Sequence, residues 1–286
     1  MPRVAANGVE IEYETFGEVG KAPLLLIMGL GAQMILWEDD FCRELAARGF
    51  HVTRFDNRDV GGSTCMTDMG VPDVGAIVMA SMTGGKVEAP YTLSDMAADV
   101  VALMDALGIP SAHVVGASMG GMIAQTLAIE HPLRVRSLTS IMSTTGDPAL
   151  PQATPEALGV LLMPAVDGRD ANIERGVSVA TGTMRMLPGD IASRAYDRGF
   201  HPDGVARQIA AIFASGNRKQ RLSAVRVPTL VIHGKEDCLV PHEGGVDTAE
   251  AIPGAKLVTI DGMGHDLPRG TWPRILDEIC ELAARA

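Results

Sequence analysis

The chain has 286 residues, of which 47% are hydrophobic and 21% charged, a composition typical of a globular protein with a substantial core. Its net charge of −11 argues against nucleic-acid binding, which requires a basic surface, and disfavours strongly anionic substrates. No apolar run approaches the ~18 residues of a membrane span, and residues 1–8 lack the apolar segment of a secretion signal. We therefore expect a cytoplasmic protein without a membrane span.

The four cysteines, Cys42, Cys65, Cys238 and Cys280, are widely spaced and show no C-x-x-C pattern. Such spacing predicts reduced thiols and favours neither a disulfide framework nor a metal site.

Short β-type runs alternate with helical patterns along most of the chain. Strands are predicted at residues 9–16, 24–28, 51–55, 113–115, 137–142, 229–232 and 256–260. Helices are predicted at residues 41–47, 93–107, 122–129 and 273–284. This alternation predicts an α/β fold with a mostly parallel central sheet and helices on both faces.

The alternation of strands and helices stops between residues 146 and 222, where prolines separate short helical stretches such as 205–214. We interpret this segment as a helical cap inserted over the active site. Residues 1–145 and 223–286 then form the core domain.

A serine lies between the predicted strand at 113–115 and the helix that follows it, in the sequence Gly116-Ala117-Ser118-Met119-Gly120. A strand that turns directly into a helix holds its apex residue in a strained conformation, and only small neighbours let the backbones pass. The pattern predicts a nucleophile elbow, with the Ser118 hydroxyl at a helix N-terminus.

A serine nucleophile needs a histidine base that is itself oriented by a carboxylate. Downstream of Ser118, the strand at 229–232 leads into a loop with Asp237, and the strand at 256–260 leads into a loop with His265. Both loops leave the carboxyl ends of strands, where open parallel sheets place their sites. The order Ser118, Asp237, His265 is that of the α/β-hydrolase triad.

Asp147 is the alternative acid, because it follows the strand at 137–142 and a carboxylate there can also reach the histidine. We expect Glu236 to point elsewhere and Asp261 to form a turn. The remaining histidines are expected to be ordinary surface, capping or pocket-lining residues; they are His51, His113, His131, His201, His233 and His242.

Two backbone N–H groups are expected to form an oxyanion hole, that of Met119 after the nucleophile and that of Leu30 in the loop after residues 24–28. Many related loops read His-Gly-x-Gly, whereas this chain has Met28 in place of the histidine. The substrate pocket is expected to include Gly29, Met142, Ile209, Phe213 and Leu267.

With these motifs the chain resembles the α/β-hydrolase superfamily over nearly its full length. Within it, four segments resemble the aclacinomycin methylesterase group, whose members hydrolyse a carboxylic methyl ester on a polyketide; the segments are residues 28–31, 54–61, 114–120 and 262–265. The resemblance implies that neither a metal nor an organic cofactor is required.

Our first hypothesis is a carboxylic ester hydrolase that acts on a small-molecule ester through an acyl-enzyme. The same triad also serves hydrolysis of a carbon–carbon bond, a thioester or a lactone. A non-catalytic ligand-binding receptor is a third reading, against which the intact triad argues. Dehalogenases and epoxide hydrolases use aspartate at the elbow, where this chain has Ser118. The sequence does not determine the oligomeric state.

Overall fold

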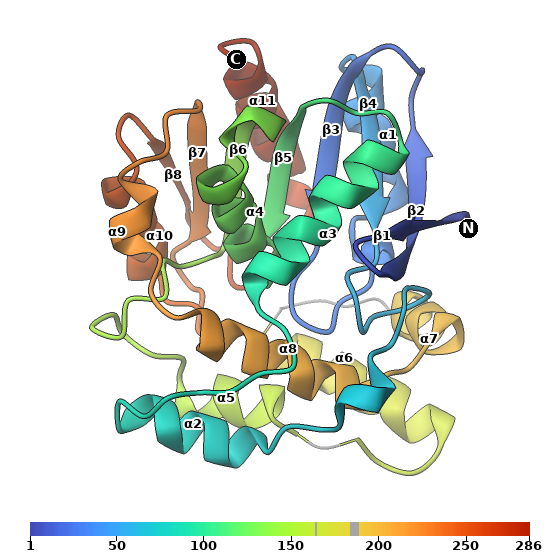
Figure 1. Ribbon diagram of the computed structural model, residues 1–286, viewed down its shortest axis with the longest axis vertical. Helices are drawn as coiled ribbons and strands as arrows, with labels where there is room; N and C mark the ends of the chain where they lie inside the picture. The colour runs from blue at the N-terminus through green and yellow to red at the C-terminus, as the bar shows by residue number, and fades with distance from the viewer. Residues whose placement is uncertain (164, 184–188) are drawn as a thin grey trace.

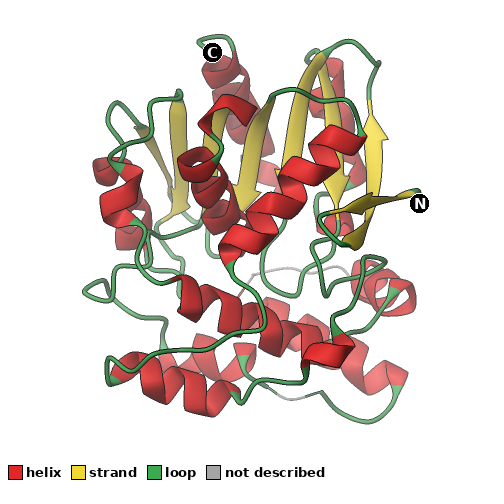
Figure 2. Cartoon of the chain, in the orientation of Figure 1, coloured by secondary structure: helices red, strands yellow, loops and turns green. Residues whose placement is uncertain are grey.

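One eight-stranded sheet forms the centre of the molecule in the computed structural model, which describes residues 1–163, 165–183 and 189–286 (Figures 1 and 2). Its strands, in chain order, are β1 (Arg3–Ala6), β2 (Val9–Phe16), β3 (Ala22–Ile27), β4 (Phe50–Phe55), β5 (Ala112–Ala117), β6 (Val135–Ile141), β7 (Thr229–Gly234) and β8 (Lys256–Ile260). The order across the sheet is β1-β2-β4-β3-β5-β6-β7-β8. Among the strand pairs of the described residues, β1–β2 and β2–β4 are antiparallel and the others are parallel, so the predicted α/β class with a mostly parallel sheet is confirmed.

Helices cover both faces of this sheet (Figure 1). On the face toward the viewer lie α3 (Leu93–Ala106) and α4 (Met119–Glu130), while α1 (Asp39–Ala47) and α11 (Trp272–Ala283) lie behind it. The helix α10 (His242–Ala251) follows β7, and short 3-10 helices occur at Met34–Leu36, Thr67–Met69, Pro132–Arg134 and Arg269–Thr271. Two apolar clusters result, one joining the sheet to α3 and α4 and the other joining it to α1 and α11.

Between β6 and β7 the chain forms helices at the carboxyl edge of the parallel strands (Figure 1). They are α5 (Pro155–Leu161), α6 (Arg169–Thr183), α7 (Gly189–Arg198), α8 (Pro202–Ser215) and α9 (Lys219–Leu222). One further helix, α2 (Val74–Met82), comes from outside this segment and packs against α8. The helix α2 is not predictable from its sequence pattern, because its apolar residues surround the helix and show no 3.6-residue period.

The two ends of this segment meet at Arg218, which is fully buried. Its backbone N–H donates to the carbonyl of Thr145 at 2.8 Å, and its guanidinium donates to the carbonyls of Thr144 at 2.9 Å and Gly216 at 3.0 Å. Burial lowers the pKa of Arg218 to about 10. An insertion into a core requires such adjacent ends; the cap boundaries at residues 146 and 222 stay a prediction.

No helix within the described ranges is both long and apolar enough to cross a membrane. The four cysteines, all of which lie in the described part of the chain, form no disulfide.

Candidate active site

Ser118 lies at the turn between β5 and α4 with φ 56° and ψ −121°, a conformation that is strained for a residue with a side chain. The turn depends on the two glycines that flank it. A Cβ at Gly116 would lie 2.1 Å from the carbonyl oxygen of Gly120, and a Cβ at Gly120 would lie 2.1 Å from that of Ile27. Only glycine at both positions allows β5, α4 and β3 to approach so closely.

Three sequence-predicted residues meet in a chain of hydrogen bonds at this turn. The Nε2 atom of His265 lies 2.9 Å from the Oγ of Ser118, and the Nδ1 atom lies 2.8 Å from the Oδ2 of Asp237. The segments after β5, β7 and β8 bring these residues together at one edge of the sheet, where β7 and β8 are adjacent and β6 separates β7 from β5. The first distance is short enough for proton transfer from serine to histidine, and the second is short enough for the carboxylate to orient the imidazole.

The carboxylate of Asp237 is buried, and both of its oxygens make hydrogen bonds. Its Oδ1 atom accepts hydrogen bonds from the backbone N–H groups of Leu239 at 3.0 Å and Val240 at 2.8 Å. Burial, the largest single effect, would raise the pKa of Asp237, but attraction to His265 and hydrogen bonds from His265 and His233 lower it to about 2. The group is therefore an anion at neutral pH.

His233 is a contact of the acid that sequence analysis did not assign to the site. The Nε2 atom of His233 lies 3.4 Å from the Oδ2 of Asp237 and 2.8 Å from the carbonyl oxygen of Val240. The ring is buried on β7, four residues before Asp237. That spacing across the strand end is the only local signal, and it is too common to identify such a contact.

The alternative acids make other contacts. Asp147 pairs with Lys219 at 3.3 Å and accepts from the N–H of Ala149 at 3.1 Å. Glu236 accepts from the N–H of Gly262 at 2.7 Å, and Asp261 pairs with Lys235 at 2.6 Å on the surface. Among the described residues, Asp237 is thus the carboxylate that contacts His265.

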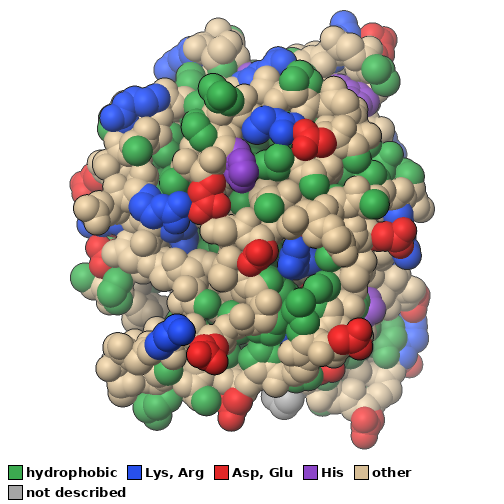
Figure 3. All heavy atoms as spheres, viewed as in Figure 1, with side chains coloured by type: hydrophobic (Ala, Val, Ile, Leu, Met, Phe, Trp, Pro, Cys, Tyr) green, Lys and Arg blue, Asp and Glu red, His purple; other side chains and the backbone are tan. Residues whose placement is uncertain are grey.

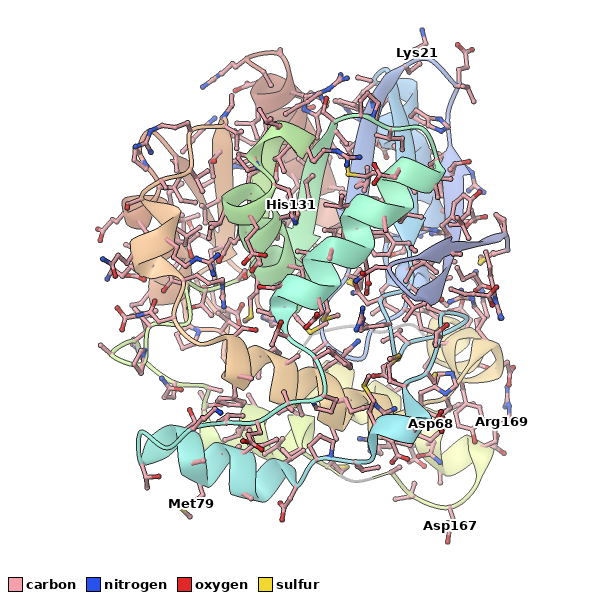
Figure 4. The ribbon with its side chains drawn as sticks, in the orientation of Figure 1. Lys21, Asp68, Met79, His131, Asp167 and Arg169 are labelled. Atoms are coloured by element: carbon pink, nitrogen blue, oxygen red, sulfur yellow. The ribbon has the colours of Figure 1, made fainter. Side chains whose placement is uncertain are left out.

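The other histidines are held in separate environments. His113 bonds to Ser137 at 2.9 Å, His201 lies 3.0 Å from the carbonyl oxygen of Gly61, and His242 lies 2.9 Å from Thr259. His131 follows the last residue of α4, at the opposite end of that helix from Ser118 (Figure 4). A helix of 12 residues separates the two by about 18 Å.

The loop after β3 lies directly beside the nucleophile. A Cβ at Gly29 would lie 3.0 Å from the Cβ and 3.5 Å from the Oγ of Ser118. Met119 is the first residue of α4, so its N–H has no acceptor within the helix. The oxyanion roles of Leu30 and Met119 stay predictions, and this proximity is what supports them.

The predicted pocket residues differ in exposure. Met142 and Ile209 are buried, Leu267 is half-buried against the cluster behind the sheet, and Phe213 is 37% exposed. A cavity of about 190 Å³ lies elsewhere, between α1 and α7, and is lined mainly by charged residues; they are Glu38, Asp39, Asp40, Asp190, Arg194 and Arg269, with Ile35 and Ile191. The pocket assignment therefore stays a prediction.

Within the described residues, no group of three or more His, Cys, Asp or Glu side chains is arranged to hold a metal ion. On the face shown in Figure 3, basic side chains are interspersed with acidic ones and form no continuous stripe. Hydrophobic side chains gather in the lower half of that face, where α8 and α2 lie in Figure 1.

Comparison with known proteins places this geometry in a family. Rhodomycin D methylesterase DnrP of Streptomyces peucetius is 28% identical over 308 residues, covering 97% of this chain and 96% of that protein. A putative carbamate hydrolase, RutD of Azorhizobium caulinodans, is also 28% identical, over 98% of this chain and 96% of its own. Among solved structures, a meta-cleavage product hydrolase from Pseudomonas fluorescens has a TM-score of 0.76 and 20% identity, covering 100% of this chain and 98% of that one.

Because the sequence identity to this solved structure is only 20%, the structural similarity shows the fold alone. The family model for the α/β hydrolase fold matches residues 22–183, more than half of the chain, and a model described as TAP-like protein matches residues 211–271. The chain therefore belongs to the α/β-hydrolase fold family and is a hydrolase of that fold.

Proposed function

We propose that this protein hydrolyses carboxylic esters through a covalent acyl-enzyme on Ser118. The observation that carries the proposal is the continuous hydrogen-bonded chain from Ser118 through His265 to Asp237. The similarity to a methylesterase over nearly the whole chain supports an ester as substrate. RutD is named a putative carbamate hydrolase, and a carbamate, like an ester, has a carbonyl carbon that a serine can attack.

In the acylation step, His265 Nε2 takes the proton of the Ser118 hydroxyl while Oγ attacks the ester carbonyl. The carbonyl oxygen becomes an oxyanion, which accepts from the backbone N–H groups of Leu30 and Met119. The protonated His265 then donates its proton to the departing alcohol. Asp237 remains ionised and holds the imidazole in the tautomer that this transfer needs.

Deacylation repeats these steps with water in place of serine. His265 takes a proton from water while the water oxygen attacks the acyl carbon. The oxyanion then collapses, the bond from the acyl carbon to Ser118 Oγ breaks, and His265 returns its proton to Oγ, which releases the acid and restores the Ser118 hydroxyl. The two steps together consume one ester and one water and release one alcohol and one acid, and the protein residues return to their starting protonation states.

Turnover of short-chain nitrophenyl esters by wild type and by Ser118→Ala tests the proposal. The variant is expected to lose about 10⁶-fold in kcat, because triad residues act as a unit. A folded Ser118→Ala protein within tenfold of wild type would refute it. A parallel panel of thioesters, lactones and carbon–carbon substrates distinguishes the ester reading from the other reactions of the same triad.

A further inference from the structure

The loop that contains Leu30 is held on both sides by buried side-chain amides from distant parts of the chain. On one side, Asn57 Nδ2 donates to the carbonyl of Met28 at 2.9 Å. On the other, Gln208 Oε1 accepts from the N–H of Gly31 at 2.8 Å. Asn57 is 3% exposed and Gln208 is 0% exposed, and their side-chain hydrogen bonds go to the backbone of Met28, Gly31 and Arg58 and not to Ser118.

These two bonds fix the peptide units on either side of the Gly29–Leu30 peptide. The Met28 carbonyl belongs to the preceding unit, and the Gly31 N–H belongs to the following one. A peptide between two anchored units has little freedom to rotate, because each unit is itself planar. The Gly29–Leu30 unit is itself anchored at its carbonyl, which accepts from the N–H of Ala32 at 3.3 Å, so the three bonds together hold the N–H of Leu30 in one direction.

Gln208 is itself fixed in orientation. Its Nε2 donates to the carbonyl of Arg58 at 2.9 Å, so the amide bridges the loop after β3 to the loop after β4. Because one partner is a donor and the other an acceptor, the positions of Oε1 and Nε2 follow from the chemistry. The preceding residue, Arg207, forms a two-bond ion pair with Asp59, at 2.9 and 2.7 Å, which anchors α8 at this point.

The helix α8 packs closely against Gly31 in the loop after β3. The backbone of Gly31 has a φ of +63°, in the left-handed region. A Cβ there would lie 2.9 Å from Cγ2 of Val205, one turn before Gln208 on α8. Glycine is required for both the backbone conformation and the approach of the helix. Two independent contacts thus tie the loop to α8.

We propose that Gln208 and Asn57 are positioning residues for the oxyanion hole, and that they brace the loop that carries Met28 where related loops have histidine. Gln208 comes from α8, so the hole is complete only with this cap helix seated on the core. The inference rests on the proposed function. It predicts a loss in the chemical step when the brace is removed, since a displacement of about 1 Å in an active site can cost 10²-fold.

The test substitutes Gln208→Met, which preserves side-chain length and removes both hydrogen bonds. We expect kcat to fall about 10- to 100-fold, less than the 10²–10³ lost with a true oxyanion donor, while KM changes little. The diagnostic measurement is the ratio of kcat/KM for an ester to that for its thionoester, whose charge develops on sulfur. A hole shaped for oxygen favours the ester, and a displaced N–H weakens that preference.

Gln33→Met is the matched control. Gln33 is also a buried glutamine that joins core and cap, since its Nε2 donates to the carbonyls of Ala195 at 2.6 Å and Gly199 at 2.8 Å on α7 and just after it. It makes no bond to the backbone of residues 28–31. We expect a comparable loss of thermal stability with an unchanged ester-to-thionoester ratio.

Gln208→Glu keeps an acceptor for Gly31 and is expected to retain most of the wild-type ratio. If Gln208→Met does not fold, Asn57→Leu removes the opposite brace, and the same fall in the ratio is expected. A folded Gln208→Met or Asn57→Leu with the wild-type ratio, or an equal change in Gln33→Met, overturns the proposal. If wild type does not hydrolyse esters, the proposed function itself fails and this inference fails with it.

Discussion

The interior of the α/β core and its interface with the cap helices differ in the proportion of apolar and polar contacts. In the core, large apolar clusters join the sheet to the helices on each face. Where the cap meets the core, Met34, Ile35 and Ile191 form a small separate cluster. Ala211 and Leu222 extend the cluster that joins the sheet to α3 and α4. Buried polar pairs supplement these contacts: Arg207 with Asp59, Arg198 with Asp56 at 2.7 Å, and the amide of Gln208 with two loops.

This difference bears on how the site is built. Apolar burial is non-directional and tolerates small shifts of one helix against another. Bidentate ion pairs and hydrogen bonds of side-chain amides instead specify one arrangement. The core supplies Ser118, Asp237 and His265 from strand ends, and the polar contacts set the position of α8 against the loop after β3. The following predictions separate the two contributions.

The largest expected effect lies within the core triad. Asp237→Asn should lower kcat by about 10⁴-fold, because the amide favours the wrong imidazole tautomer. Asp147→Asn should cost little, since Asp147 pairs with Lys219 instead of the histidine. Steady-state kinetics of both variants on one ester checks this; the reverse ranking would reassign the acid.

Arg207→Met tests the polar contact between cap and core. The pair it breaks is almost fully buried, with side chains of Arg207 and Asp59 that are 2% and 0% exposed. Removing one partner leaves an uncompensated buried charge and should lower the free energy of unfolding by about 3–5 kcal/mol. Urea denaturation measures the change.

Arg169→Met is the control for that substitution, since Arg169 pairs with Asp197 at the outer surface of the cap (Figure 4). This exposed pair is expected to contribute no measurable stability. Equal losses of unfolding free energy in Arg207→Met and Arg169→Met would mean that burial of the Arg207–Asp59 pair does not determine its contribution to stability.

Stability at low pH should depend on Asp237. Its folded-state pKa of about 2 lies below the ordinary 3.8. The stabilisation is therefore fully present above pH 3.8, and it is lost as the pH falls through about 2. It amounts to roughly 2 kcal/mol. The difference in unfolding free energy between wild type and Asp237→Asn should narrow over that interval; a constant difference would show that the carboxylate is not specifically stabilised.

The smallest effect concerns the acyl pocket. If the cap roofs an apolar pocket, each added methylene contributes up to ~0.8 kcal/mol, about fourfold in kcat/KM, until the pocket is full. An acyl series from acetate to octanoate measures this. A flat profile, or a preference for charged acyl groups, would contradict an apolar pocket that includes Ile209 and Met142.

The fold and the contact between Ser118, His265 and Asp237 could be predicted because their signals are local; the catalytic roles of these residues stay a proposal. Ser118, Asp237 and His265 each follow a short apolar strand, and the parallel topology brings those strand ends to one edge. Gly116 and Gly120 could be predicted from the sequence because the backbones of β5, α4 and β3 approach so closely there that no side chain fits.

The remaining contacts have no such local pattern. Gln208 meets Gly31 across 177 positions, and no periodicity in either segment indicates the pairing. His233 sits in an apolar strand like any core residue, and its approach to Asp237 depends on how the following loop turns. The helix α2 is apolar around its circumference, so it lacks the amphipathic pattern that identifies surface helices.

The central claim is that the core triad makes Ser118 a nucleophile, and covalent labelling tests it most directly. Wild type and His265→Ala are treated with a fluorophosphonate, and the modified residue is identified by peptide mass spectrometry. The account predicts a single phosphonyl adduct on Ser118 in wild type and little or none in His265→Ala under the same conditions. An adduct on another residue, or equal labelling of Ser118 in both proteins, would contradict it.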